Sequence, residues 1–363
     1  MDTILRKIGI DIIGITKNYD IDKIYKRLVK RREKNYHTEF EFDINKRLDI
    51  ESILPGWKNI ISIGISYNFN IESIDAELKG RVSKSAIGRD YHLILNEKMD
   101  ALIKALNEEG YEFNYFKGVD TTPLVDREIA AEAGIGFFGK NNSIINEEYG
   151  SFIFLGFIII DIDISELWGK NRILENRCIN CNLCIKSCPT NALRDNNDMD
   201  AKRCLSYLTQ TKEDIPFDLR EKINTLYGCD ICQNVCPYNR NAIKKDEKEI
   251  IDIDLEDIIF ISNKEFKRKY GDKAFSWRGK NIIRRNAVIL LSKIVNKKSK
   301  DILIELLKDS SEMIRKYSIW ALYMHGYLDL EAIILKASGR YLEENINELK
   351  RIEEFYVIKK GNR

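Results

Sequence analysis

All eight cysteines of this 363-residue chain lie in one stretch, between Cys178 and Cys236. The stretch opens with four cysteines at the spacing Cys-x2-Cys-x2-Cys-x3-Cys-Pro and closes with Cys-x2-Cys-x3-Cys-Pro, and Cys204 stands between the two runs. This pattern constrains the fold more than any other feature, because thiols that bind a common metal centre must bring their segments together.

The spacing predicts two 4Fe-4S clusters. In such runs three thiolates separated by two residues surround one cluster, and the fourth, before proline, ligates a second. Applied to both runs, this rule uses every cysteine. One predicted ligand set is Cys178, Cys181, Cys184 and Cys236, and the other is Cys188, Cys204, Cys229 and Cys232. Two clusters close together form a short path for electrons, so the first functional inference is redox chemistry.

Two other uses of the cysteines fit the pattern less well. Disulfides would require an oxidising compartment, and the sequence shows no secretory signal. A tetrathiolate zinc site could use the two Cys-x2-Cys pairs, but it would leave four cysteines and both Cys-Pro endings unexplained. We therefore expect a cytoplasmic protein. No membrane contact is expected either, because the longest apolar run, Phe152 to Ile160, is far shorter than the roughly 20 residues that span a bilayer.

The formal net charge of +2 hides a basic block. Residues 261–300 contain thirteen Lys or Arg and only two acids, Glu265 and Asp272. A block this basic in an otherwise balanced chain indicates a polyanionic partner, most often nucleic acid.

Hydrophobic periodicity predicts strands separated by helices. Ile4, Ile8 and Ile12 recur at helical spacing, so residues 1 to about 45 are predicted to be helical. Residues 59–67, 111–116 and 152–160 are predicted as strands, and residues 91–106 as a helix. Asp120 or Thr121 is expected to cap a helix that Pro123 begins. Together these elements predict an α+β domain.

The C-terminal region contains a repeat with a period of 31 residues. The segments that begin at Ile283 and Ile314 match, and two short helices per repeat would form a HEAT-like unit. Basic pairs occupy the same register in both segments, Arg284-Arg285 and Arg315-Lys316. We expect these pairs to form a charged edge that faces a phosphate backbone.

The assembled motifs resemble the epoxyqueuosine reductase family over nearly the whole chain. The resemblance is carried by the double cysteine runs, the Asp120-Thr-Thr-Pro loop, the Ala-Gly-Ile-Gly-Phe-Phe-Gly-Lys-Asn segment (133–141), the Cys204-Leu-Ser-Tyr-Leu-Thr segment, the segment 227–239 and the C-terminal repeat. Phe137-Phe138 departs from the family, which usually has one aromatic residue there, often tryptophan.

The resemblance implies three domains. A nitroreductase-like, cobalamin-binding sheet domain is expected at 1–165, a ferredoxin-like domain with two 4Fe-4S clusters at 166–245, and a basic linker with the HEAT-like helical domain at 246–363. The implied cofactors are base-off cobalamin and the two clusters. None of the three histidines lies in an Asp-x-His-x-x-Gly motif that would supply a cobalt ligand.

The implied reaction reduces the epoxide of epoxyqueuosine, at the wobble position of a tRNA, to the alkene of queuosine. Asp120 matches the family's proton donor, and a closed apolar pocket would raise the pKa of its carboxyl. The implied cofactor-binding residues share an expected position facing the corrin. They are Arg47, Ser85, Ala86, Asp120, Lys140, Asn141, Ser143 and Ser151. The tRNA-binding candidates are Tyr207, Gln210, Trp277, Arg278, Lys280, Arg284 and Arg285.

The implied partners are a tRNA with a queuosine-type anticodon and an external electron donor such as a flavodoxin or ferredoxin, and the protein is expected to be a monomer. Three alternatives stay open on the residues alone. A cobalamin-dependent reductive dehalogenase shares the cofactors but usually has an export signal and has no use for a basic tail. An electron-transfer protein without substrate chemistry would leave the Asp120 loop without a role. A nucleic-acid-binding protein with structural clusters would lack cobalamin.

Overall fold

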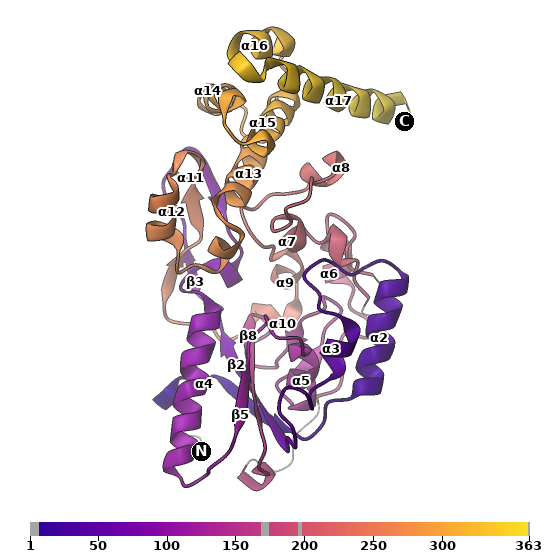
Figure 1. The fold of residues 1–363 in the computed structure, drawn as a ribbon, viewed down its shortest axis with the longest axis vertical. Coiled ribbons are helices and arrows are strands. Elements are labelled where there is room, and N and C mark those ends of the chain that lie inside the picture. The colour runs from indigo at the N-terminus through magenta and orange to yellow at the C-terminus, as the bar shows by residue number, and fades with distance from the viewer. Residues whose placement is uncertain (1–6, 168–173, 195–197, 362–363) are drawn as a thin grey trace. The chain divides into compact units, whose positions relative to one another are not determined.

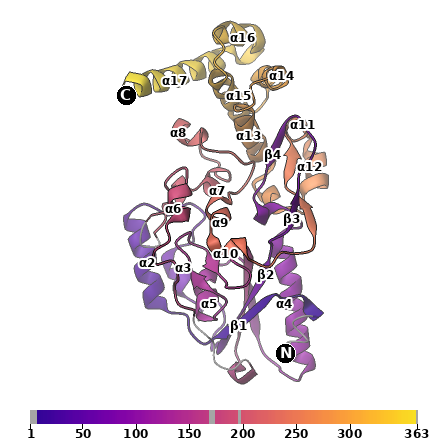
Figure 2. The ribbon, with the colours of Figure 1, turned by 180° about the vertical axis from the view of Figure 1, so that it is seen from behind.

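The computed structural model describes residues 7–167, 174–194 and 198–361, and it divides the chain into two compact units. The first unit comprises residues 1–71, 84–204 and 230–249, and the second comprises 72–83, 205–229 and 250–363. Figures 1 and 2 show the elements of each unit from opposite sides. The predicted ferredoxin-like segment thus contributes residues to both units, and the three-domain division stays a prediction.

A four-stranded antiparallel sheet forms the centre of the first unit, with the strand order β1-β2-β8-β5. Its strands are β1 (Ile12–Thr16), β2 (Asn59–Ser66), β5 (Tyr115–Gly118) and β8 (Ile153–Ile160). β2 and β8 pair over eight residues, from Asn59 opposite Ile160 to Ser66 opposite Ile153. The predictions for residues 59–67 and 152–160 are therefore confirmed, and the strand predicted at 111–116 begins four residues later.

Helices cover both faces of this sheet (Figure 1). On one face, α4 (Tyr91–Glu108) buries Leu95, Met99 and Leu102 against the isoleucines of β2 and β8. On the other face, α2 (Ile21–Glu33) and α5 (Asp126–Glu132) pack Ile24 and Ile129 against the sheet. Because both faces are covered, every residue of β2 is buried.

The prediction of helix over the first 45 residues is wrong at Ile12–Thr16, which forms the edge strand β1. Helical spacing of isoleucines could not distinguish the two states, because β-branched residues also suit a strand and pairing with β2 decides the outcome. Gly14 fits this position because a Cβ there would lie 2.0 Å from the carbonyl oxygen of Ala133, just after α5.

The remaining elements of the first unit are short and position the cysteines and the loops around the sheet. They are α3 (Ile44–Leu48), η1 (Lys84–Ala86), β6 (Phe137–Phe138), β7 (Ile144–Ile145), η2 (Ser165–Leu167), α6 (Leu183–Ser187), η4 (Ala201–Arg203), α9 (Ile231–Asn234) and α10 (Pro237–Arg240). The strands β3 (Asn70–Glu72) and β9 (Lys248–Ile250) contain points at which the chain passes from one unit to the other.

The second unit combines a two-stranded antiparallel ribbon with helices. The ribbon pairs β4 (Lys79–Arg81) with β10 (Asp252–Asp254). Its helices are α7 (Leu205–Leu208), α8 (Phe217–Arg220), α11 (Leu255–Phe260), α12 (Asn263–Tyr270), η5 (Ala274–Arg278), α13 (Lys280–Leu291), α14 (Lys297–Glu305), η6 (Leu306–Lys308), α15 (Glu312–Met324), α16 (Leu330–Ala337), η7 (Gly339–Tyr341) and α17 (Leu342–Gly361).

The period of 31 residues corresponds to the pairs α13/α14 and α15/α16, in which α13 packs on α15 and α14 on α16. Its assignment to the HEAT class stays a prediction. Within the described part of the chain, no helix is both long enough and apolar enough to cross a membrane.

Candidate functional site

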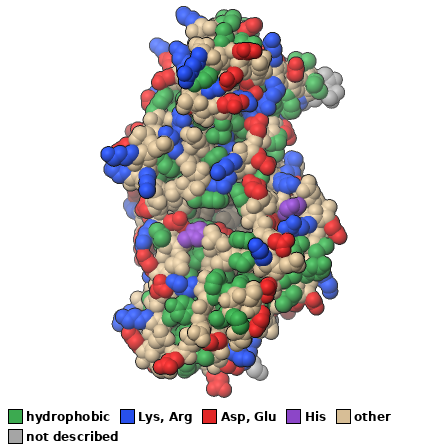
Figure 3. Space-filling model, viewed as in Figure 1, with side chains coloured by type: hydrophobic (Ala, Val, Ile, Leu, Met, Phe, Trp, Pro, Cys, Tyr) green, Lys and Arg blue, Asp and Glu red, His purple; other side chains and the backbone are tan. Residues whose placement is uncertain are grey.

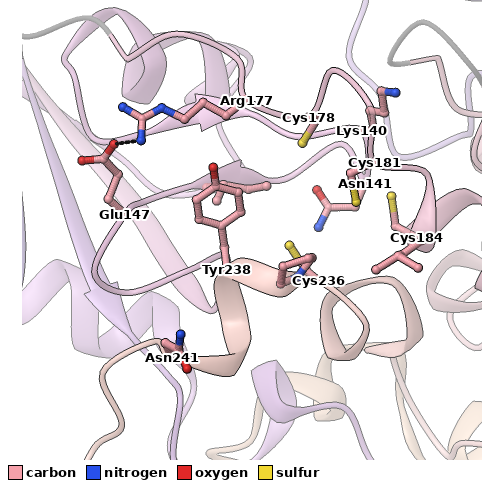
Figure 4. A pocket seen from close by; sticks show the side chains of 13 residues that line it. Lys140, Asn141, Glu147, Arg177, Cys178, Cys181, Cys184, Cys236, Tyr238 and Asn241 are labelled. Carbon is pink, nitrogen blue, oxygen red and sulfur yellow. Dashed lines mark ion pairs between the residues drawn. The ribbon is translucent and has the colours of Figure 1, made fainter.

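Four of the eight cysteines line one cavity in the first unit, with a volume of about 450 Å³. Cys178, Cys181 and Cys184 come from the first run, and Cys236 comes from the end of the second run. Figure 4 shows their sulfur atoms around a common space. The structure therefore brings together the four cysteines that the crossing rule assigns to one cluster.

The chemistry of this cavity suits an iron-sulfur cluster. Burial raises the pKa of the Cys184 thiol, and the charges of Cys178, Cys181 and Cys236 raise it further. The free thiolates are therefore disfavoured in the empty cavity, and the positive charge of a metal centre would stabilise them as ligands. Asn141 also lines the cavity, and its buried Nδ2 has no hydrogen-bond partner among the described residues. A buried donor without a partner is what a sulfide or thiolate acceptor would satisfy.

The other predicted ligand set is Cys188, Cys204, Cys229 and Cys232, and its grouping stays a prediction. Three of these cysteines belong to the first unit, and Cys229 ends a segment of the second. Burial raises the pKa of the Cys188 thiol, but hydrogen bonds, including those from the backbone N–H groups of Leu193 and Ala192, lower it by more, so it lies below its ordinary value. The lowered pKa favours the thiolate form of Cys188, which is the form that binds a metal centre.

A row of stacked aromatic rings lies in the first unit. Tyr67 stacks on Phe154 with ring centroids 4.2 Å apart, Phe154 stacks on Tyr91 at 4.6 Å, and Tyr91 stacks on His92 at 4.2 Å. At one end, Tyr67 shares a hydrogen bond with the side chain of Gln233, the neighbour of Cys232. At the other end, the Tyr91 hydroxyl donates to Asp120 Oδ2 at 2.6 Å.

Asp120 is exposed, so the expectation of a closed apolar pocket around it is wrong for this conformation. The loop that carries it (residues 119–125, the Asp120 loop) follows β5; its residues Asp120 and Thr121 are exposed, whereas Leu124 and Val125 are buried. Its backbone is unusual, because Asp120 has a φ of +45°, in the left-handed region that few non-glycine residues adopt. The backbone N–H of Asp120 donates to Asp126 Oδ2 at 2.8 Å.

The raised carboxyl pKa expected in this region belongs to Asp126. Burial raises the pKa of Asp126 to about 6, and the negative charge of Asp120 contributes. His92 also titrates above its ordinary value: burial lowers its pKa, but the hydrogen bond to Asp90 and the charges of Asp120 and Asp126 raise it by more. Neither Asp126 nor Tyr91 was predicted as a site residue, because nothing in the linear pattern shows that they reach the Asp120 loop.

The predicted cobalamin-facing residues fall into separate places. Ser143 and Ser151 line a cavity of about 190 Å³ together with Tyr67 and Gln233. Lys140 and Asn141 line the cysteine cavity instead, where Lys140 Nζ donates to Asn182 Oδ1 at 2.7 Å.

The other three predicted residues lie on α3 and η1. Arg47 is on α3, and its carbonyl oxygen accepts from the Tyr19 hydroxyl at 2.6 Å. Ser85 and Ala86 lie on η1, and Ala86 is buried. The structure therefore pairs Ser143 with Ser151 in one cavity and Lys140 with Asn141 in another, and it shows no single cavity that all the predicted residues line.

The residues near Asp120 fit a polar ligand such as a corrin with its amide side chains. Arg47 Nε, Thr122 Oγ1 and His92 Nε2 are buried, and they have no hydrogen-bond partner within the described part of the chain. Buried polar atoms normally have partners, and Thr122 in the Asp120 loop and His92 next to Tyr91 would gain them from a bound group that supplies acceptors or donors.

In the second unit, four of the tRNA-binding candidates form a network. Trp277 is 56% exposed, and its Nε1 donates to the Tyr227 hydroxyl at 2.8 Å. Tyr227 in turn donates to Gln210 at 3.0 Å, and the Arg278 guanidinium lies 4.5 Å from the Trp277 ring centroid. Tyr207 lies on α7, and the backbone N–H of Gln210 donates to its carbonyl oxygen at 2.8 Å. An exposed indole held rigidly beside an arginine is a surface on which a nucleobase can stack.

Arg284 and Arg285 were predicted to reach phosphate, and this prediction is wrong. Both side chains are buried, and Arg285 is 0% exposed. Arg285 donates to the carbonyl oxygens of Thr211 and Leu208 at 2.7 and 2.9 Å, and Arg284 donates to Ile259 and pairs with Asp309. The reason is that residues 282–291 of α13 are all buried, so the helix leaves no charged edge. Lys280 donates to the carbonyl oxygen of Ile261 at 3.0 Å.

Part of the exposed surface of the basic block lies on α12. Phe266 and Tyr270 face inward four residues apart, and Lys264, Lys267 and Arg268 are exposed. Figure 3 shows Lys and Arg side chains gathered over this helix. Lys264, Lys267 and Arg268 were not predicted as site residues from the sequence. The spacing of Phe266 and Tyr270 was an available signal, because it indicates a helix that buries its aromatic residues and exposes its basic ones.

Comparison with known proteins gives consistent results. A family model described as "4Fe-4S double cluster binding domain" matches residues 177–239, and one described as "Epoxyqueuosine reductase QueG, DUF1730" matches residues 47–121. The protein therefore has an iron-sulfur domain of the double-cluster type. The epoxyqueuosine reductase of Bacillus cereus is 35% identical over 98% of this chain and 96% of its own length.

Solved structures of epoxyqueuosine reductases share the mixed helix and sheet fold. One, determined with an epoxyqueuosine-modified tRNA-Tyr stem loop, has a TM-score of 0.85 and 33% identity, and the match covers 96% of this chain and 98% of the other. Another, from Bacillus subtilis, has its catalytic aspartate loop swung out of the active site; its TM-score is 0.87 and its identity 33%, with 97% and 98% coverage. The chain belongs to the epoxyqueuosine reductase family.

Proposed function

We propose that this protein reduces epoxyqueuosine to queuosine at the wobble position of a tRNA. Removal of the epoxide oxygen as water consumes two electrons and two protons, and it leaves a carbon-carbon double bond. The proposal rests on family membership, and the observation that carries it is the presence, in one unit, of a four-cysteine cavity and an exposed aspartate held by a tyrosine hydroxyl.

The electrons enter through the clusters. Cys178, Cys181, Cys184 and Cys236 would hold one cluster, and Cys188, Cys204, Cys229 and Cys232 the other. Gln233 and Tyr67 connect the neighbourhood of Cys232 to the aromatic row that ends at Asp120. This row would form one side of the region where the substrate reacts.

Asp120 would deliver the proton to the oxygen that leaves the carbon. A general acid must lie within hydrogen-bond reach of the atom it protonates, and an exposed loop position lets Asp120 approach a nucleoside that enters from solvent. Tyr91 orients the carboxyl through the bond of 2.6 Å to Oδ2. Arg47, Ser85, Ser143 and Ser151 are the proposed contacts to base-off cobalamin, which when bound would supply a strongly reducing cobalt centre.

The second unit would hold the tRNA. Trp277 is the proposed stacking platform for an anticodon-loop base, and Arg278 would add a charge beside it. Lys264, Lys267 and Arg268 on α12 are the proposed phosphate contacts, because exposed cations supply the salt-dependent part of nucleic-acid affinity. An external electron donor of the flavodoxin or ferredoxin type completes the proposal.

The test is anaerobic reduction of an epoxyqueuosine-containing anticodon stem-loop by the cluster- and cobalamin-loaded protein. The wild type is expected to produce queuosine, and Asp120→Asn is expected to lose roughly 100-fold or more in kcat, because general acids contribute about that much. Asp100→Asn is the matched control, since Asp100 is an exposed carboxylate of the same unit that forms an ion pair with Lys117. Equal kcat values for all three proteins would remove Asp120 from the reaction, and the absence of queuosine from the wild type would remove the proposed substrate.

A further inference from the structure

The carboxylate of Asp126 accepts a hydrogen bond from outside its own helix. It is the first residue of α5, and the residue before it, Val125, provides no side-chain cap. An aspartate at a helix start commonly bonds to N–H groups of its own first turn. The Asp126 carboxylate also reaches back and accepts the backbone N–H of Asp120, six residues earlier, at 2.8 Å. The bond closes the Asp120 loop into a ring.

The loop needs such a bond because its backbone is strained. Asp120 has a φ of +45°, and non-glycine residues persist in that region when surrounding contacts hold them there. The far end of the loop is held separately, because the N–H of Val125 donates to the Tyr19 hydroxyl at 3.0 Å. Asp126 therefore holds the strained end, and Tyr19 holds the other end.

The carboxylate of Asp120 is held at a second point by Tyr91, whose ring is fixed between Phe154 and His92. The position of the Asp120 backbone determines whether its side chain can reach this hydroxyl. In the Bacillus subtilis relative the catalytic aspartate loop is swung out of the active site, so a loop of this family can occupy more than one position. Contacts made in only one position determine how often it is occupied.

The charged and titratable groups around Asp126 come from several elements. They are Asp120 on its loop, Arg127 on α5, Tyr19 before α2, and His92 on α4. Burial and the charge of Asp120 raise the pKa of Asp126 to about 6, so its carboxylate is mostly ionised at neutral pH. An ionised acceptor makes a stronger hydrogen bond to an N–H than a neutral one.

We propose that Asp126 is a positioning residue for the reduction, which acts by accepting the backbone N–H of Asp120 and thereby keeps the Asp120 carboxyl at the Tyr91 hydroxyl. The inference rests on the proposed function in one respect, because it assigns Asp126 to the reaction that Asp120 serves. The hydrogen bond itself does not depend on the substrate.

Three variants test the proposal in the loaded, full-length protein. Asp126→Ala removes the acceptor, and Asp126→Asn keeps an acceptor oxygen of the same shape. Glu132→Ala is the matched control, since Glu132 lies on the same helix and pairs with Lys23 at 3.2 Å, away from the loop. Circular dichroism and iron content establish that each variant is folded and loaded.

Two measurements distinguish a positioning role from a general structural one. Amide hydrogen exchange of residues 119–125, without substrate, should accelerate roughly tenfold in Asp126→Ala, as the loss of one charge-assisted hydrogen bond implies. With the stem-loop substrate, kcat of Asp126→Ala should fall about 10- to 100-fold, with KM within about threefold of wild type, because small misplacements of a catalytic group cost this much. Asp126→Asn and Glu132→Ala should stay within about threefold of wild type in both measurements.

The outcomes separate cleanly. Unchanged loop exchange in Asp126→Ala, or unchanged kcat, would overturn the positioning role. Equal defects in Asp126→Asn and Asp126→Ala would show that the acceptor is not what matters, and would overturn it as well. If the wild type does not reduce epoxyqueuosine while Asp126→Ala still accelerates loop exchange, the proposed function fails and the hold of Asp126 on Asp120 stands.

Discussion

Replacing Arg285 by alanine should destabilise the fold and leave the contacts between the protein and tRNA phosphates unchanged. Arg285 is fully buried and donates to the carbonyl oxygens of Thr211 and Leu208 and to Asn286 Oδ1. Hydrogen bonds from a charged donor contribute about 1.5–3 kcal/mol each, so their loss costs roughly 5–9 kcal/mol. Burying the charge offsets part of this contribution.

The size of the offset follows from the pKa of the guanidinium. Burial, with the nearby Arg220 contributing, lowers the pKa of Arg285 from 12.5 to about 10, which corresponds to about 3 kcal/mol that alanine recovers. The net loss in the free energy of unfolding is therefore expected to be about 2–6 kcal/mol, close to the range for breaking a buried charged network. A loss of this size lowers Tm by roughly 5–15 °C.

The assay combines thermal unfolding with tRNA binding at several salt concentrations, measured well below the Tm of the variant. Arg285→Ala should show the lower Tm and an unchanged dependence of log Kd on log salt. Lys267→Ala on α12 is the comparison, and it should show an unchanged Tm and a slope reduced by about 1, as expected for the loss of one phosphate contact. The reasoning is refuted if Arg285→Ala keeps the wild-type Tm and instead loses about 1 from the slope.

Three further predictions concern the clusters, the pH dependence and the stacking platform. Cys178→Ser should reduce the iron content from about eight to about four atoms per chain, measured by metal analysis of anaerobic protein, and a value near eight would contradict the ligand assignment. Because the pKa of Asp126 is raised to about 6, the folded state binds its proton more tightly than the unfolded state, and wild type loses stability as pH rises toward 6. Asp126→Asn removes this loss. Its Tm should therefore exceed that of wild type by an amount that grows mainly between about pH 4 and pH 6 and reflects up to about 3 kcal/mol. A Tm difference that does not vary with pH would argue against the raised pKa. Trp277→Ala should weaken stem-loop binding by about 10-fold with an unchanged salt slope, as expected for one lost stacking contact, and unaltered Kd would exclude the platform.

The sequence predicted well those elements whose own pattern determines them. Residues 59–67 and 152–160 are rich in isoleucine and form the paired central strands, and the spacing of Leu95, Met99 and Leu102 places α4 on the sheet. The cysteine spacing also predicts which four thiols share the cavity, because a cluster of fixed size allows few arrangements of its ligands.

Features that depend on contacts between distant residues were not predicted. Ile12 carries a helical spacing but lies in β1, since pairing with β2 outweighs local preference. Asp120 and Thr121 were expected to cap the following helix, but its N-cap is Val125, and Asp126 bonds back to Asp120. The density of basic residues could not show that Arg285 is buried, because burial depends on what packs around α13.

The origin of the four thiols in the cysteine cavity has a consequence for biogenesis. A cluster held by Cys178, Cys181, Cys184 and Cys236 is a cross-link that closes a long loop of the chain, and closing such a loop restricts the unfolded ensemble. Cys236 is made last, so a nascent chain on the ribosome can offer three ligands long before the fourth emerges. Iron starvation would therefore leave a polypeptide with an open loop, and cellular proteases would have access to it.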